Sequence, residues 1–291
     1  MIFTIKNNHL SVSIDSYGSH LKSIMAHGRE YLWQGDPAVW PNRAPILFPI
    51  CARMRNNKYT VDGKVYELDP HGFAKYTEFE VAEQTEDSIT FTTCYNEKTL
   101  AVYPYKFKFS IKFSLDKNKI IKRYIVENLS NGIIYYEAGG HDGFNVPFND
   151  DETMDDCKIR IPGIDSFSPY EQDENVTLLP KARNIAAKDG LIDLKPSIHG
   201  LNCIIVEGLP IPRAELVDKN KNVKLAVEFP MMPYLTLWSM PKDFDVNFVC
   251  IEPWTSLPDA NFVSSELKDK VGVRLLEAGQ SETTGYDIII Y

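Results

Sequence analysis

The sequence lacks long apolar runs, a leader-like beginning and an excess of positive charge. Among its 291 residues there is no stretch of about 18 consecutive apolar residues, so we expect no membrane-spanning helix. The first residues show no basic segment followed by an apolar one, so we expect no secretory signal peptide. With 31 Lys and Arg against 40 Asp and Glu, the formal net charge is −9. Because nucleic-acid phosphates bind basic patches, this balance argues against a nucleic-acid partner.

Cysteine is sparse, and its spacing excludes the common paired-cysteine sites. No CxxC pattern occurs, and no two cysteines lie close together in the sequence. An odd number of scattered cysteines is typical of buried free thiols in a reducing compartment, so we expect a cytoplasmic protein. The five residues are Cys51, Cys94, Cys157, Cys203 and Cys250.

The short motifs of nucleotide, metal and nucleophile chemistry are also missing. There is no P-loop, no GxGxxG fingerprint and no GxSxG elbow of the serine hydrolases. His71, His141 and Glu252 are chemically possible zinc ligands, but no HxH, HExxH or paired-cysteine spacing supports a metal site. We therefore expect an activity that needs neither a metal nor an organic cofactor.

What the sequence does contain is alternation of apolar and polar residues with a period of two. From Tyr105 to Leu115 every odd position is apolar or aromatic, and every even position is Lys or Ser. This pattern predicts a strand of an antiparallel sheet with one face in the core and one in water. Asp62-Gly63 between two β-branched runs is a strong hairpin signal for residues 59–66. Further strands are expected at residues 2–5, 10–14, 79–82, 88–94, 120–128, 132–137, 214–217, 223–229 and 282–290.

Helical patterns are few, and nothing divides the chain. Residues 263–271 are expected to form one short helix, and residues 16–22 a turn or the start of a strand. No linker rich in Pro, Ser or Gly and no internal repeat occurs, so we expect one domain over residues 1–291. Roughly fifteen to twenty short strands in one domain predict an all-β fold, either a large antiparallel β-sandwich or a barrel-like pair of sheets.

Two histidines stand in segments whose neighbours fix the path of the backbone. Pro70 stiffens the entry to His71, and Gly72 frees its exit. Two glycines precede His141 and allow its backbone to approach another group closely. Site residues often lie on such bends past a strand end, although a lone histidine is more often a surface residue or a satisfied core residue.

Glu252 lies within the apolar segment Val249–Trp254. Burying a carboxylate is costly unless it is paired or useful. It either pairs with an arginine such as Arg53 or Arg55, or it serves as a base whose pKa is raised by apolar walls. Two imidazoles and one carboxylate in one pocket would supply acid–base chemistry for a neutral substrate.

Arginine and tryptophan side chains offer possible contacts to a polar ligand. Arginines beside an apolar run can fork hydrogen bonds to sugar hydroxyls or bind a phosphate, and Arg43, Arg53 and Arg55 are candidates. Tryptophans can stack on a sugar face, although most are core or loop anchors. The four tryptophans are Trp33, Trp40, Trp238 and Trp254.

Several short segments follow one another in a distinctive order. They are Leu32–Pro37, Trp40, Ala44–Ile50, Arg53, Tyr59–Lys64, His71–Ala74, His141 and Glu252–Trp254. Together they resemble the aldose 1-epimerase (galactose mutarotase-like) family, and within it the bacterial LacX-like branch. The resemblance extends over about residues 2–290, and it implies the family's large antiparallel β-sandwich, often called a supersandwich.

The resemblance also implies a role for each matching residue. His141 corresponds to the general acid that protonates the pyranose ring oxygen, and Glu252 to the general base that deprotonates the C1 hydroxyl. His71 corresponds to a second histidine that hydrogen-bonds the substrate near the reacting centre. Arg53 corresponds to an arginine that binds sugar hydroxyls.

The sequence departs from the family pattern in two places. Mutarotases carry an Asn-Arg pair where this chain has Ala52-Arg53. They also carry an aspartate that binds sugar hydroxyls, and the nearest region here offers Asn202 instead. Both differences concern recognition of the sugar more than the reaction.

Three readings of the function follow. The first is an aldose 1-epimerase that interconverts the anomers of an aldohexose, as a monomer or homodimer. The second is a hexose-6-phosphate 1-epimerase, for which Arg43 and Arg55 are candidate phosphate ligands. The third is a non-catalytic sugar-binding protein, although binding alone does not require a matched acid and base.

Overall fold

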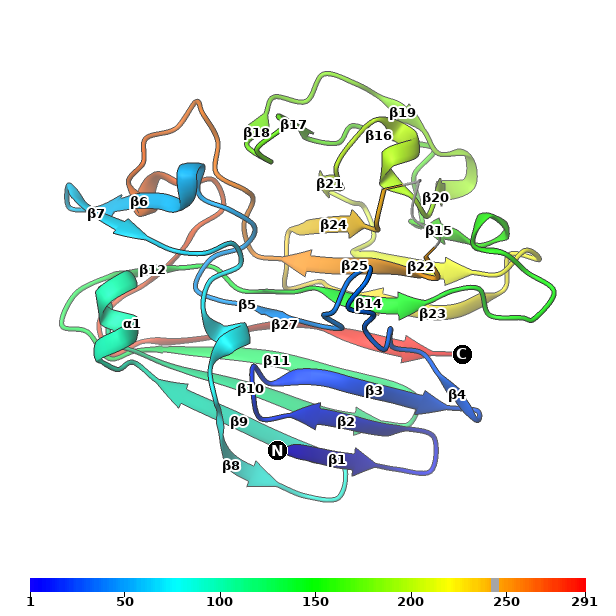
Figure 1. The fold of residues 1–291 in the computed structure, drawn as a ribbon, viewed down its shortest axis with the longest axis horizontal. Coiled ribbons are helices and arrows are strands. Elements are labelled where there is room, and N and C mark those ends of the chain that lie inside the picture. Colours follow the sequence, from blue (N-terminus) through cyan, green and yellow to red (C-terminus); the bar gives the residue numbers. More distant parts are fainter. Residues whose placement is uncertain (242–245) are drawn as a thin grey trace.

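The computed structural model describes residues 1–241 and 246–291, and its main feature is a pair of large antiparallel sheets (Figure 1). The larger sheet has nine strands, in the spatial order β20 (Leu191–Asp193), β15 (Lys158–Arg160), β22 (Arg213–Val217), β23 (Val223–Glu228), β27 (Ser281–Ile290), β11 (Lys119–Asn128), β10 (Phe107–Asp116), β9 (Ser88–Cys94) and β8 (Glu80–Gln84).

The second large sheet carries the segments that the sequence singled out. Its order is β21 (Ile204–Glu207), β24 (Tyr234–Trp238), β25 (Phe248–Trp254), β13 (Gly139–Gly140) and β5 (Ile46–Leu47), and β14 (Asp142–Asn145) also pairs with β25. A third sheet at the N-terminus is formed by β1 (Ile2–Lys6), β2 (Ser11–Asp15), β3 (His20–Ala26) and β4 (Arg29–Glu30). This architecture confirms the expected all-β antiparallel sandwich.

Short elements complete the described part of the chain. The two-stranded pairs are β6 (Lys58–Val61) with β7 (Lys64–Glu67), β12 (Ile134–Tyr136) with β26 (Arg274–Leu276), β16 (Ser166–Phe167) with β19 (Ile185–Ala186), and β17 (Glu171–Gln172) with β18 (Leu178–Leu179). The helical elements are α1 (Glu97–Val102) and the 3₁₀ turns η1 (Arg55–Asn57), η2 (Ala74–Tyr76), η3 (Met154–Asp156), η4 (Lys188–Gly190), η5 (Pro196–His199) and η6 (Leu267–Asp269). None of the helices described is long and apolar enough to cross a membrane.

The strongest alternation in the sequence forms the centre of the nine-stranded sheet. In β10 the side chains of Phe107, Phe109, Ile111 and Phe113 are fully buried, while the intervening lysines are partly exposed. β10 pairs with β9 on one side and β11 on the other, as expected for a half-buried central strand. Phe48, which follows β5, stacks on Phe109 with ring centroids 4.1 Å apart. The core therefore fills the space between the two large sheets.

Most of the expected hairpins are present, whereas the expected helix at residues 263–271 is wrong. Only the single turn η6 forms there, because the preceding segment pairs with β6. Thr60 donates its backbone N–H to Ser265 O at 2.8 Å, and the Glu266 carboxylate accepts the backbone N–H groups of Asp62 and Gly63. Tertiary pairing thus overrides a weak local helix preference. The expected strand at residues 132–137 is shorter, and the structure contains more strands than expected because many span only two or three residues.

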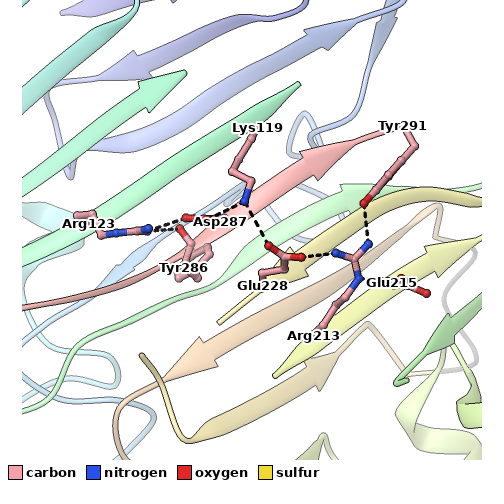
Figure 2. A network of polar contacts seen from close by, with 8 residues as sticks. All are labelled: Lys119, Arg123, Arg213, Glu215, Glu228, Tyr286, Asp287 and Tyr291. Carbon is pink, nitrogen blue, oxygen red and sulfur yellow. Dashed lines mark hydrogen bonds and ion pairs between the residues drawn. The ribbon is translucent and has the colours of Figure 1, made fainter. Parts of the chain in front are cut away.

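A polar network ties four neighbouring strands together on the outer face of the nine-stranded sheet (Figure 2). Lys119 on β11 contacts Glu228 on β23 at 3.3 Å and Asp287 on β27 at 3.2 Å. Arg213 on β22 contacts Glu228 and also donates to the hydroxyl of Tyr291 at 2.7 Å. The side chains are partly buried, and ion pairs near the surface contribute little individually, so this network connects the four strands more than it adds stability.

Candidate active site

The register of the smaller sheet brings His141 and Glu252 together. Asp142 on β14 pairs with Ile251 on β25, and one step further along both strands His141 faces Glu252. The His141 Nδ1 and Glu252 Oε1 atoms are 3.4 Å apart. Because side chains alternate across a sheet, these two point to the outer face while Asp142 points into the core. Two residues that are 111 positions apart in the sequence therefore become direct neighbours.

Both groups lie in a cavity of about 350 Å³ on the outer face of this sheet. Its walls include the aromatic residues Trp40, Trp238 and Trp254. The indole of Trp40 stacks on the His141 ring at a centroid distance of 5.2 Å, and Trp238 meets the same ring edge-on at 5.5 Å. The imidazole is thus held in one orientation by packing on two sides.

His71 reaches the same cavity from the loop after β7. Its backbone N–H donates to Ala52 O at 2.6 Å, and its Nδ1 accepts the Ala52 N–H at 3.2 Å. A neutral imidazole that accepts at Nδ1 carries its proton on Nε2, which makes Nε2 a donor. The His71 and His141 rings meet edge-to-face at 5.4 Å. Gly72 is required next to His71, because it has φ +70° and a Cβ would lie 2.2 Å from Phe48 O.

The electrostatics of the His141–Glu252 pair are dominated by burial. Removal from water, together with the charge of Asp142, raises the pKa of the Glu252 carboxyl well above its ordinary value. Burial lowers the pKa of His141 to about 3. In the described part of the chain, neither carboxylate oxygen of Glu252 nor Nδ1 of His141 has a hydrogen-bond partner. Such unmet groups at a cavity wall are free to bind and exchange protons with a ligand.

His71 and Thr236 complete the inner wall. Burial, followed by the neighbouring His141, lowers the pKa of His71 well below its ordinary value, which favours the neutral donor form. Thr236 on β24 pairs in register with Glu252, and its buried hydroxyl has no partner among the described residues. Thr236 carries no motif, so only the strand register reveals it.

The structure separates the three candidate arginines. Arg53 lines the cavity and is exposed, and within the described residues its guanidinium forms no ion pair. Arg43 donates instead to Gln34 Oε1 and Lys22 O, both at 2.7 Å. Arg55 pairs with Asp259 at 2.9 Å. Neither Arg43 nor Arg55 is part of the cavity wall, so the expectation that they bind a phosphate there is wrong.

Two further polar residues stand at the wall of the cavity. Lys75 from η2 lines it and donates to Pro70 O at 2.7 Å, and no motif in the sequence pointed to it. Asn202, the expected substitute for the family's aspartate, is also part of the wall. The cavity thus combines aromatic faces, cations and the amides of Asn42 and Asn202 around His141 and Glu252.

One cluster near the site has the donor atoms for a metal ion. One ring nitrogen of His141, the thiol of Cys250 and a carboxylate oxygen of Glu252 lie within 4.8 Å of one another. Burial and the Glu252 charge raise the pKa of the Cys250 thiol well above its ordinary value, which opposes the thiolate form that metals bind. The chemistry of this set therefore suits proton transfer better than coordination.

Comparison with known proteins places this geometry in a family. A model of the aldose 1-epimerase family matches residues 1–269. The chain belongs to the aldose 1-epimerase family. The plasmid-encoded protein LacX of Lactococcus lactis subsp. lactis is 30% identical over 100% of this chain and 99% of its own length.

Two solved structures of galactose mutarotase-like proteins agree with this fold over its whole length. The galactose mutarotase related enzyme of Lactobacillus acidophilus shares 31% identity with a TM-score of 0.93, covering 100% of this chain and 97% of that one. A galactose mutarotase-like protein of Lactobacillus casei shares 25% identity with a TM-score of 0.89 and full coverage of both chains.

Membership of the aldose 1-epimerase family makes the protein an isomerase of the LacX-like branch. The expected family and fold are confirmed. Of the predicted site residues, His71, His141, Glu252 and Arg53 meet at one cavity.

Proposed function

We propose that the protein is a mutarotase that interconverts the α and β anomers of an aldohexose by general acid–base catalysis. One observation carries the proposal: His141 and Glu252 lie 3.4 Å apart at the wall of an aromatic-lined cavity, with unpaired polar atoms. Ring opening needs one group that accepts the anomeric proton and one that delivers a proton to the ring oxygen. Both groups line the cavity in which we propose that the sugar binds.

In the proposed reaction Glu252 removes the proton of the C1 hydroxyl while His141 protonates the ring oxygen. The bond between C1 and the ring oxygen breaks, and the open-chain aldehyde forms. Rotation about C1–C2 exposes the other carbonyl face, and the ring closes with both groups acting in reverse. The balance of protons is restored, so neither a cofactor nor an external base is consumed.

The buried pair shares the proton that this reaction needs. Burial favours a neutral carboxyl at Glu252 and a neutral imidazole at His141. A sugar hydroxyl that donates to Glu252 favours the carboxylate, and the ring oxygen favours a protonated His141. We propose that His71 donates from Nε2 to a hydroxyl near C1, and that Arg53 binds hydroxyls further along the sugar.

A hexose 6-phosphate is the second candidate substrate, because two cations, Arg53 and Lys75, stand at the cavity wall. Within the described part of the wall, Glu252 is the single carboxylate. An anionic group on the sugar would gain from this balance. If the substrate carries a phosphate, Arg53→Met should raise KM for the hexose 6-phosphate at least about tenfold and leave KM for the free hexose nearly unchanged. Equal effects on both sugars would exclude the phosphate.

Polarimetry of freshly dissolved α-D-galactose, α-D-glucose and their 6-phosphates tests the function directly. Wild-type protein should accelerate the decay of optical rotation, and Glu252→Gln should lower the rate about 100- to 10,000-fold. Glu67→Gln, which alters an exposed carboxylate outside the cavity, is the matched control and should retain full activity. Sugar binding by wild type without acceleration would favour the non-catalytic sugar-binding reading. A fully active Glu252→Gln variant would refute the mechanism.

A further inference from the structure

A second cluster of ionisable side chains lies directly behind the candidate active site, in the core between the two large sheets. Lys122 on β11 and Asp142 on β14 both have 0% exposed side chains. The Lys122 Nζ contacts Asp142 Oδ1 at 3.0 Å and donates to the hydroxyl of Tyr286 at 2.8 Å. Tyr286 on β27 donates in turn to Asp142 Oδ2 at 2.5 Å. The three side chains form a closed triad with no access to water.

Burial of such a triad in a protein core has a large desolvation cost. Apolar side chains of the same volume often give equal or greater stability than a buried ion pair. The surroundings are aromatic: the Lys122 ammonium lies 5.8 Å from the centroid of the Phe113 ring and 5.1 Å from that of Tyr286. The acid–base reaction described above uses none of these groups, so their presence calls for another role.

The triad touches the backbone on both sides of His141. Asp142 is the next residue in the chain, and its side chain points to the core while that of His141 points to the cavity. On the other side, the Tyr286 hydroxyl occupies the space above Gly140, where a Cβ would lie only 1.8 Å from it. The imidazole therefore sits on a segment held at residues 140 and 142, in the break between β13 and β14.

Tyr286 is itself firmly placed by the network on the outer face of the nine-stranded sheet. Arg123 donates to the backbone carbonyl of Tyr286 at 3.1 Å and pairs with Asp287 at 2.7 Å (Figure 2). The phenol points to the opposite side, into the core, where it reaches Asp142. The larger sheet thus provides a rigid support for the segment that carries His141.

We propose that Lys122, Asp142 and Tyr286 are positioning residues that hold the His141 imidazole against Glu252 and set the charge behind the pair. The proposal rests on the proposed acid–base function of these two groups. Misplacement of a catalytic group by about 1 Å can lower a rate about 100-fold, so a rigid support has a measurable effect.

The charge of the triad also acts on Glu252. Asp142 raises the pKa of the Glu252 carboxyl, second only to burial, and Lys122 pairs with Asp142. The other titratable or charged groups around Glu252 come from the packed elements and the cavity wall. They are His141, Cys250, Cys203, His71, Arg53 and Lys75. None of these six groups is a carboxylate. Asp142 is the carboxylate that faces Glu252 through the sheet.

Two sets of variants test the proposal in the full-length protein. Tyr286→Phe removes the hydroxyl from the triad, and Tyr103→Phe is the matched control, since it removes an equally buried hydroxyl that donates to Tyr135 O outside the triad. We expect Tyr286→Phe to lower kcat about tenfold with KM within twofold, and Tyr103→Phe to leave both unchanged. Equal kcat values for the two variants and wild type would overturn the positioning role.

The double variant Lys122→Met/Asp142→Asn tests the electrostatic part. The Asp142 charge raises the pKa of Glu252, whereas Lys122 is not among the groups that shift it, so removal of both charges should lower the pKa of Glu252 and shift the acid limb of kcat/KM to lower pH. A purely structural role would scale the whole pH profile without moving that limb, and this result would overturn the electrostatic claim. Thermal unfolding confirms that each variant is folded at the assay temperature.

Failure of this inference can be told apart from failure of the proposed function. If Glu252→Gln abolishes mutarotation while the triad variants retain both kcat and the pH profile, the triad is structural and the function stands. If Glu252→Gln retains full activity, the acid–base assignment itself is wrong, and with it the proposed role of the triad.

Discussion

At the scale of single residues, Glu252 shows how stability and chemistry oppose one another. Its carboxylate is 1% exposed and has no hydrogen-bond partner among the described residues. A buried polar group without a partner lowers the free energy of unfolding, and such strain is tolerated where it serves a reaction. We therefore expect Glu252 to lower the free energy of unfolding, and to lower it more as the pH rises and ionisation of the carboxyl is favoured.

Replacement of Glu252 by Gln should stabilise the protein in a pH-dependent way. The pKa of Glu252 is raised in the folded state, so folding favours the protonated form. Protonated Glu252 therefore contributes to the stability of the folded protein at pH values below the pKa that it has in the unfolded chain. This contribution is lost as the pH rises through its pKa in the folded protein. Urea denaturation should show Glu252→Gln more stable than wild type by about 1–2 kcal/mol at pH 8, with a smaller gain at pH 5. A larger gain at pH 5 would contradict the raised pKa.

His20 makes the opposite contribution at low pH. Its pKa is lowered to about 4, chiefly by burial and then by Lys22, and its Nε2 has no hydrogen-bond partner in the described structure. Stability is therefore complete above the unfolded pKa of about 6.5 and is lost as pH falls through about 4. Between these values wild type should lose up to about 1.4 kcal/mol per pH unit through this group.

The variant His20→Gln removes that titration and should flatten the pH dependence of the unfolding free energy between pH 6.5 and 4. The exposed His9→Gln is the control and should leave the curve unchanged. Denaturant titrations at several pH values measure the slopes. Identical slopes for His20→Gln and wild type would show that His20 is accessible to protons in the folded state.

At the scale of secondary-structure elements, the two-residue strand β13 depends on glycine for steric reasons. A Cβ on Gly140 would overlap the Tyr286 hydroxyl, and one on Gly139 would lie 2.7 Å from Cδ1 of Trp254. Gly140→Ala should lower the unfolding free energy by about 1–3 kcal/mol and reduce activity, because the hydroxyl must move. Gly132→Ala, with no atom within 4 Å of the new Cβ, is the matched control in thermal unfolding. Equal stability of the two variants would contradict this packing.

The elements also show which features a sequence can reveal. The alternation in residues 105–115 predicts β10 because a half-buried strand imposes a period of two. No periodicity exists in β13, which spans two residues, so its position opposite Trp254 depends on register alone. Thr236 and Lys75 carry no motif, and only the folded structure brings them to the cavity, so neither could be identified from the sequence. The predicted residues His71, His141, Glu252 and Arg53 rested on a family resemblance and on bends marked by Gly or Pro.

At the scale of the whole molecule, the Lys122–Asp142 pair joins the two large sheets. Lys122 belongs to the nine-stranded sheet and Asp142 to the smaller sheet that carries the candidate active site. Neither residue stood out in the sequence, because a lysine in an alternating strand is typical of the solvent face. Sequence patterns alone do not show which face of β11 the second sheet covers, so this contact becomes visible only when the sheets pack.

Breaking this pair should destabilise the entire sandwich, whereas replacing it should not. Lys122→Met leaves the Asp142 carboxylate buried without its counter-ion, and we expect a loss of about 3–5 kcal/mol in the free energy of unfolding. Lys122→Met/Asp142→Asn removes both charges and should recover most of that loss, since buried ion pairs contribute little net stability. The half-exposed pair Lys108–Glu127 on β10 and β11, 2.8 Å apart, is the control, and Lys108→Met should cost less than about 1 kcal/mol. Urea denaturation of the four proteins measures these differences. If the double variant were as unstable as Lys122→Met, the stability of the sheet interface would depend on the ion pair itself, and a role confined to supporting His141 would be excluded.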